Sequence, residues 1–302
     1  FAKFDPSLFL RKGLIGQEVK DQEVSVAIIQ FLEKFGVEWV GRTKDMGETI
    51  QPRFQANIYK EYFTEEQLSK STKQAIRTAR NKGVEVVFGG LELLDEFAAL
   101  MKKTEARKGI HLRGKDYYEK LLTTYAGQSY ITLSRINLSQ RLTSLENQLE
   151  KNLLEVSRFN EKTKPGKIDN NRQEKERLEE EIQFLKQALD AGKETVSLSG
   201  TLTLEYGATS ENVYAGMDEN FRRYQPAILT WYETAQHAFD RGADWQNMGG
   251  IENDLDGGLY HFKSKFNPMI EEFVGEFNLP TSLLYPLVNK AYQLRKKLRN
   301  KQ

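Results

Sequence analysis

Hydrophobic positions in the middle of the chain form two ladders of apolar residues. The first ladder steps by three and four residues through Leu138, Leu142, Leu145, Leu149, Leu153 and Val156. The second does the same through Leu178, Ile182, Leu185 and Leu189. A Lys164-Pro165-Gly166-Lys167 turn separates them. Because residues three and four apart share one helix face, the pattern predicts two helices that close on each other as an antiparallel coiled-coil arm over residues 137–192.

On both sides of this arm the apolar pattern switches between the helical and the strand period. The helical spacing predicts helices over residues 22–35, 68–82, 91–107, 115–124, 227–241 and 282–298. Alternating or continuous apolar runs predict strands over residues 37–40, 54–63, 84–88, 129–136, 195–206, 212–216, 244–250 and 269–276. Residues 258–266 fit neither period and are expected to be irregular. Strands interleaved with helices indicate an α/β or α+β body.

Composition narrows the class of protein. With 302 residues and 39% hydrophobic content, the chain is long enough for two folded domains. No apolar run approaches the roughly 18 to 20 residues of a membrane-spanning helix. The absence of cysteine excludes disulfides, thiolate metal sites and cysteine nucleophiles. The 44 basic and 43 acidic side chains nearly cancel, so bulk charge does not indicate a polyanion binder.

Signatures of common catalytic chemistries are missing from the sequence. It has no phosphate-binding loop, dinucleotide fingerprint, Gly-x-Ser-x-Gly elbow or His-Glu-x-x-His helix. The histidines His111, His237 and His261 are not spaced as metal ligands, so no metal site is expected. Asp254 and Asp256 lie in a glycine-bounded turn, which favours a solvated loop over acid/base catalysis.

One segment has an unusual composition for a loop. Residues 257–266 place two lysines and three bulky aromatic residues after a paired glycine. Further upstream, residues 212–216 and 222–226 precede the predicted helix that contains Trp231. Each block alone is a weak signal, but they occur in a fixed order along the chain.

Together these blocks resemble the FemABX family of peptidoglycan bridge aminoacyltransferases, and most of all its pneumococcal branch-forming subgroup. The resemblance extends over nearly the whole chain and rests on Asp5-Pro6, residues 71–84 and 113–118, Tyr224-Gln225-Pro226 with Trp231, Gly249-Gly250, Phe262-Lys263 and Gly275-Glu276-Phe277. The predicted arm is similar to the coiled-coil insertion that part of this family carries. By this resemblance the chain lacks the N-terminal part of the family pattern, including a lysine that binds the precursor.

The resemblance implies a body of two acetyltransferase-like (GNAT-like) domains, of which the first is incomplete. The implied boundaries are 1–48 and 277–302 for the remnant of the first domain, 49–136 and 193–276 for the second, and 137–192 for the arm.

The resemblance also implies an activity and its residues. Members of the family transfer an amino acid from aminoacyl-tRNA to the stem-peptide lysine of a lipid-linked peptidoglycan precursor, lipid II, or of its UDP-linked form. The precursor-binding positions fall on Asp5, Arg113, Tyr117 and Tyr214, and the pair Phe262-Lys263 falls where the family handles the aminoacyl end and catalysis. Asp5 is also a candidate proton acceptor, although it could instead only orient the substrate. Ala or Ser is the expected amino acid, with Gly as the other candidate.

This chemistry suits a chain without a triad. The aminoacyl ester is already activated, so an amine can attack it without a covalent enzyme intermediate. No cofactor is expected beyond aminoacyl-tRNA as co-substrate. A lysine ammonium such as that of Lys263 can stabilise the tetrahedral oxyanion, with an effect of roughly 100- to 1000-fold per donor. The resemblance implies a cytoplasmic location and leaves open a peripheral contact with the inner face of the membrane.

Other interpretations of the same residues stay open. Tyr117, Tyr118 and Tyr214 could be ordinary core or rim aromatics, and Lys263 could be a surface lysine with an extended stem. The rival class of function is a non-enzymatic scaffold that uses the arm to bind partners. An acetyl-CoA-dependent enzyme is disfavoured because the chain has no Gln/Arg-x-x-Gly-x-Gly/Ala loop. The oligomeric state and the position of the added residue in the bridge are also left open.

Overall fold

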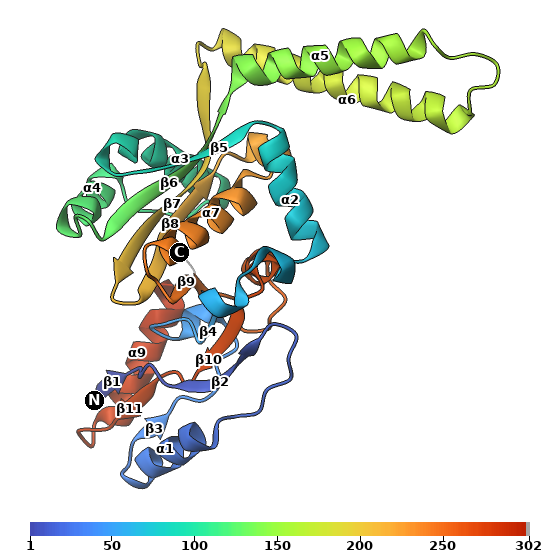
Figure 1. The fold of residues 1–302 in the computed structure, drawn as a ribbon. Coiled ribbons are helices and arrows are strands. Elements are labelled where there is room, and N and C mark those ends of the chain that lie inside the picture. Colours follow the sequence, from blue (N-terminus) through green and yellow to red (C-terminus); the bar gives the residue numbers. More distant parts are fainter. Residues whose placement is uncertain (300–302) are drawn as a thin grey trace. The chain divides into compact units, whose positions relative to one another are not determined.

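The computed structural model describes residues 1–299, with side chains described through residue 296, and has a mixed α/β architecture (Figure 1). Contacts divide the chain into two compact units. Unit 1 consists of Phe1–Ser69, Gly207–Glu211 and the residues from Gly242 onward. Unit 2 consists of Lys70–Tyr206 and Asn212–Arg241. Within the described residues, no helix is both long and apolar enough to cross a membrane.

Unit 1 contains two sets of paired strands. A small antiparallel sheet has the order β1-β11-β3, from strands β1 (Ala2–Phe4), β11 (Phe277–Leu279) and β3 (Glu38–Trp39). A second antiparallel set has the order β2-β10-β4-β9, from β2 (Phe9–Leu14), β10 (Met269–Phe273), β4 (Phe54–Tyr59) and β9 (Trp245–Gly250). The first three residues of β8 (Thr209–Met217) also belong to unit 1 and pair in parallel with β9.

The helices of unit 1 are α1 (Glu23–Lys34), α8 (Gly258–Lys263) and α9 (Tyr285–Arg299). Helix α1 buries Ile29 in a core with Leu10, Val274 and Phe277. The residues whose spacing predicts this helix lie mostly on its other side. Val24, Phe31 and Phe35 are all more than half exposed. The helix was therefore predicted correctly, but its apolar pattern does not mark the core-facing side.

Unit 2 is built on four strands in the order β8-β7-β6-β5. Besides β8 they are β5 (Val84–Gly89), β6 (Ser129–Asn137) and β7 (Thr195–Tyr206). Its body helices are α2 (Lys70–Asn81), α3 (Leu94–Lys108), α4 (Lys115–Thr124) and α7 (Pro226–Asp240).

Alternate residues of β7 contact different helices, as the two faces of a strand require. On one face, Leu202 belongs to the same hydrophobic core as Phe97 of α3. A Cβ atom added to Gly200, on this face too, would lie 3.2 Å from the Phe97 ring. On the other face, the Thr201 hydroxyl bonds to that of Thr234 on α7 at 3.1 Å. Helices α3 and α7 thus cover opposite faces of this strand.

The two leucine ladders form α5 (Leu138–Val156) and α6 (Pro165–Asp190), which pack against each other (Figure 1). Their side chains pair in reverse order: Lys186 with Glu146 at 3.0 Å, and Lys167 with Glu155 at 2.8 Å. The two helices are therefore antiparallel. Pro165 is the first helical residue of α6, a position where its missing N–H costs nothing.

Several sequence predictions need correction in unit 1. Residues 258–266 are not irregular, because α8 and a short 3-10 helix (Ser264–Phe266) occupy them. The strand predicted over 269–276 is β10, which ends already at Phe273. Strand β11 begins only after Gly275, which has φ +79°, and was not predicted. Strands β1 and β2 were not predicted.

The compact units divide the chain at different residues from the predicted domains. Three stretches that the prediction gave to the second acetyltransferase-like domain cluster with unit 1: residues 49–69, 207–211 and 242–276. Units defined by contacts and domains defined by descent need not coincide, so the GNAT-like assignment stays a prediction. Residues 300–302 of the predicted first domain lie outside the described residues.

Candidate active site

Lys263, the last residue of α8, has a buried side chain. It is only 5% exposed, and its Nζ donates a hydrogen bond of 2.7 Å to the carbonyl oxygen of Gly250 at the end of β9. Burying an ammonium is costly unless it is hydrogen-bonded. The alternative interpretation of Lys263 as a surface lysine is therefore wrong.

Helix α8 exists because its N-terminus is capped from a distance in sequence. The Glu252 carboxylate accepts hydrogen bonds from the backbone N–H groups of Leu259 and Tyr260, at 3.0 and 2.9 Å. Such groups have no partner within their own helix, and a negative charge is favourable there. Although burial opposes it, these bonds hold the pKa of Glu252 below its usual value. Sequence reasoning missed Glu252, because a carboxylate six residues before a short helix gives no periodic signal.

Phe262 precedes Lys263 on the same short helix. Its ring meets that of the buried Phe266 edge to face, with centroids 5.6 Å apart and planes at 68°. The predicted pair Phe262-Lys263 thus consists of an aromatic ring and an ammonium on adjacent residues of a capped helical turn.

Asp5 follows β1 and is half-buried. Its carboxylate accepts a long hydrogen bond of 3.4 Å from the backbone N–H of Gln51, and it lies near Glu276, which pairs with Lys3 at 2.6 Å. Burial raises the pKa of Asp5, and the negative charge of Glu276 raises it further. The carboxylate therefore binds a proton more readily than an ordinary aspartate.

Two consecutive residues of unit 1 link the neighbourhoods of Asp5 and Lys263. Gln51 donates its N–H to Asp5, while the next residue, Pro52, packs on Gly250, where an added Cβ would lie 2.5 Å from the proline ring. Gly250 in turn accepts the bond from Lys263. This close approach explains why glycine occupies position 250.

The three other predicted binding residues come together in unit 2. Arg113 lies two residues before α4, Tyr117 lies in its first turn, and Tyr214 lies on β8. The Arg113 guanidinium carbon is 5.2 Å from the Tyr117 ring centroid, and the Tyr117 and Tyr214 centroids are 6.2 Å apart. Arg113 is exposed and Tyr117 is 40% exposed, so this cluster is open to solvent.

Tyr118 is buried and packs against Tyr214 of the same cluster. It is 1% exposed, its ring centroid lies 5.0 Å from that of Tyr214, and burial raises its pKa to about 12. Its hydroxyl has no hydrogen-bond partner among the described residues. For Tyr118, the interpretation as a core aromatic is correct.

Comparison with known proteins identifies the family. The model of the FemAB family matches residues 1–296. The aminoacyltransferase FemB of Staphylococcus epidermidis is 28% identical over 294 residues, covering 92% of this chain and 70% of the relative. The lipid II:glycine glycyltransferase of Staphylococcus haemolyticus is 24% identical over 309 residues, covering 97% of this chain and 70% of the relative. The crystal structure of FemX shares the fold, with a TM-score of 0.64 and 23% identity over 97% of this chain and 74% of that one. The chain is thus an aminoacyltransferase and belongs to the FemAB family.

Proposed function

We propose that this chain transfers an amino acid from aminoacyl-tRNA to the stem-peptide lysine of a lipid-linked peptidoglycan precursor. Two relatives support the substrate class by name: one is an aminoacyltransferase and the other a lipid II:glycine glycyltransferase. The observation that carries the proposal is the buried Lys263, whose ammonium is fixed by the carbonyl of Gly250 in a position that the family uses for catalysis.

The reaction needs the protein to stabilise an oxyanion, to accept the amine proton or orient the amine, and to hold the aminoacyl end. The acceptor amine attacks the ester carbonyl, a C–N bond forms, the C–O bond to the tRNA ribose breaks, and the proton lost by the amine is balanced by the one that the ribose oxygen gains. Lys263 provides a positive charge for the oxyanion of the tetrahedral intermediate. Asp5, whose pKa is raised by burial, is suited to accept the amine proton or to orient the amine. Phe262 offers an aromatic surface next to Lys263 for the aminoacyl end.

Arg113, Tyr117 and Tyr214 are proposed to bind the precursor. A guanidinium beside two tyrosine hydroxyls provides several donors for phosphate or sugar oxygens. Because the cluster is exposed, a ligand can reach it without unfolding any element.

The amino acid transferred is proposed to be Ala or Ser. Gly is the competing candidate, and the name of the Staphylococcus haemolyticus relative supports it. With a lipid-linked acceptor the protein would work at the inner face of the membrane. A scaffold without activity is not favoured, because a degenerate body would have no reason to retain a buried and hydrogen-bonded lysine at this position.

A transfer assay tests the proposal. The purified chain is mixed with labelled alanyl-, seryl- or glycyl-tRNA and either the lipid-linked or the UDP-linked precursor, and label in the precursor is followed over time. We expect transfer from one of the three tRNAs, with the lipid-linked acceptor preferred. No label transfer from any of them, by a chain shown to be folded, would leave the scaffold function as the better one.

A further inference from the structure

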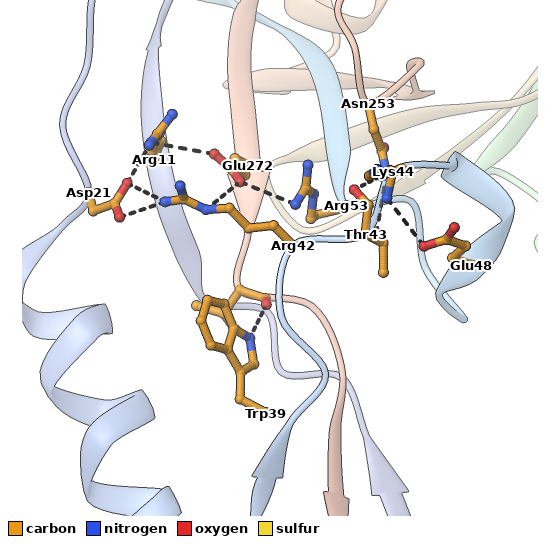
Figure 2. A network of polar contacts seen from close by, with 11 residues as sticks. Arg11, Asp21, Trp39, Arg42, Thr43, Lys44, Glu48, Arg53, Asn253 and Glu272 are labelled. Atoms are coloured by element: carbon orange, nitrogen blue, oxygen red, sulfur yellow. Dashed lines mark hydrogen bonds and ion pairs between the residues drawn. The ribbon is translucent and has the colours of Figure 1, made fainter. Parts of the chain in front are cut away.

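Three arginines of unit 1 surround one buried carboxylate, and none of them is among the residues assigned above. Figure 2 shows Arg11, Arg42 and Arg53 around Glu272. Arg11 on β2 lies opposite Glu272 on β10 in the strand register, Arg42 follows β3, and Arg53 immediately precedes β4. We refer to these three residues as the arginine cluster.

The arginine cluster does not bind Glu272 tightly. The closest approaches to its carboxylate are 3.5 Å from Arg11, 3.6 Å from Arg42 and 3.7 Å from Arg53. Charge-assisted hydrogen bonds between nitrogen and oxygen are normally about 2.7 to 2.9 Å long. Arg11 and Arg42 instead direct their short bonds to Asp21, at 2.5 and 2.6 Å.

Arg53 is the least satisfied member. It is 6% exposed, yet its Nε and Nη1 atoms have no hydrogen-bond partner among the described residues. One oxygen of Glu272 also lacks one. Burial lowers the pKa of Arg53 and raises that of Glu272, because it disfavours the charged form of each side chain. Buried guanidinium nitrogens without acceptors are uncommon in folded proteins and call for a partner.

Charge and geometry indicate what kind of partner fits. Three guanidinium groups face two carboxylates, those of Glu272 and Asp21, which leaves one positive charge in excess. The charge of the nearby Lys44 is offset by Glu48, whose carboxylate accepts a hydrogen bond from the Lys44 backbone N–H, so the excess stays at one (Figure 2). A phosphate offers three or four acceptor oxygens, more than a carboxylate, and arginine matches such oxygens in pairs. Arg11 and Arg42 are 37% and 41% exposed, so the cluster is open on one side.

We propose that the arginine cluster binds a phosphate group of a ligand, with Arg42 and Arg11 at the surface and Arg53 beneath them. The source of the phosphate rests on the proposed function, because both proposed substrates carry one: the tRNA backbone and the diphosphate of the precursor. Asp21 then keeps Arg11 and Arg42 in place for the incoming anion.

Titration calorimetry of the whole chain with inorganic pyrophosphate tests the site. We expect Arg42→Gln to weaken pyrophosphate binding at least tenfold, since this partly exposed residue can be changed without emptying the core. Arg53→Gln should remove binding, provided that circular dichroism shows it folded. Arg222→Gln is the matched control, because Arg222 also pairs with a carboxylate, that of Glu219 at 3.2 Å, but lies in unit 2. It should bind pyrophosphate as the wild type does.

The other arms of the experiment identify the source of the phosphate, and three outcomes would overturn the proposal. If a short single-stranded RNA displaces pyrophosphate, the phosphate is that of an RNA backbone. If the UDP-linked precursor displaces it and the RNA does not, the precursor diphosphate is the source. Wild-type protein that does not bind pyrophosphate, an Arg42→Gln variant that binds it equally well, or acetate that binds as strongly as pyrophosphate would each overturn the proposal. None of these measurements requires transfer, so a wild-type chain that transfers amino acids but does not bind pyrophosphate would contradict this site alone.

Discussion

Lys263 and the cluster of Arg113, Tyr117 and Tyr214 differ in how firmly the fold holds their polar groups. The Lys263 ammonium is buried and bonded to a backbone carbonyl at the end of a capped helix. The groups of the cluster are exposed or half-buried and interact with one another through their rings and the hydroxyl of Tyr214. A charge fixed before the substrate arrives needs no reorganisation during the reaction, whereas an exposed cluster can adapt to a ligand. With the proposed function, this difference predicts that changes at Lys263 mainly alter the rate and that changes at the cluster mainly alter affinity.

The largest effect is expected for Lys263→Met. It removes the charge proposed to stabilise the oxyanion and keeps a side chain of similar length, so transfer should fall at least about 100-fold. Because Lys263 is buried, thermal melting alongside single-turnover rates tests whether the variant keeps its fold. Lys265→Met, an exposed neighbour, is the control and should transfer at the wild-type rate. Near-normal turnover of Lys263→Met would remove Lys263 from the mechanism.

Asp5→Asn should produce the next largest loss, at least about tenfold in rate, if the carboxylate accepts a proton. The folded-state pKa of Asp5 is raised, so acid protonates it in a range above the ordinary value of 3.8. Wild-type activity should therefore fall as pH drops through that raised pKa, and the variant should lose this part of the profile. The contribution of Asp5 to folding stability depends on pH in the opposite direction to activity. A carboxyl whose folded pKa is raised favours folding at low pH, and this contribution is lost as pH rises through the folded pKa.

The outcome separates the two roles of Asp5. A variant that keeps the acid limb and loses only affinity would show that Asp5 orients the acceptor and leaves the base to another group.

Arg113→Ala should mainly weaken acceptor binding. A hydrogen bond to a charged group contributes roughly 1.5 to 3 kcal/mol, so the Michaelis constant for the precursor should rise about tenfold or more while kcat changes little. Tyr214→Phe removes one neutral hydroxyl and should have a smaller effect in the same direction. Tyr125→Phe, an exposed tyrosine next to α4, serves as the control. A fall in kcat with an unchanged Michaelis constant would contradict the role in affinity that is proposed for Arg113.

The sequence was informative where local periodicity determines structure. The leucine ladders predicted α5 and α6, and the apolar alternation predicted β7 with its bounds. Helix α8 was missed because it depends on the carboxylate of Glu252, a contact that no period encodes. The pattern of α1 was misleading in another way, since its most regular apolar stripe is exposed. Propensity and spacing predict that a helix forms, while the side it buries is decided by its neighbours.

The candidate residues show the same limit. Arg113 and Tyr117 flank the start of the helix predicted over residues 115–124, and the structure places them together at the start of α4. The contact of both with Tyr214 spans about a hundred residues and could be proposed only by resemblance. Neither the burial of Lys263 nor the arginine cluster could be predicted, because both depend on strands and loops distant in sequence.

The smallest effect is expected at the tip of the arm, which contrasts with Lys263 because its charges are exposed. Residues Arg158, Lys162, Lys164 and Lys167 line a cavity of about 370 Å³ together with Phe159. Two tip cations are already paired with carboxylates, Lys167 with Glu155 and Arg172 with Asp169. If the tip contacts tRNA, replacing Lys162 and Lys164 by Gln should raise the Michaelis constant for aminoacyl-tRNA a few-fold and lower the salt slope of binding by roughly one per lost phosphate contact. Lys186→Gln, near the end of α6 that is far from the tip, should change neither quantity. A tRNA affinity that stays the same in the tip variant, at low and physiological salt alike, would mean that the arm is a spacer or a contact between protein copies and takes no part in binding the donor.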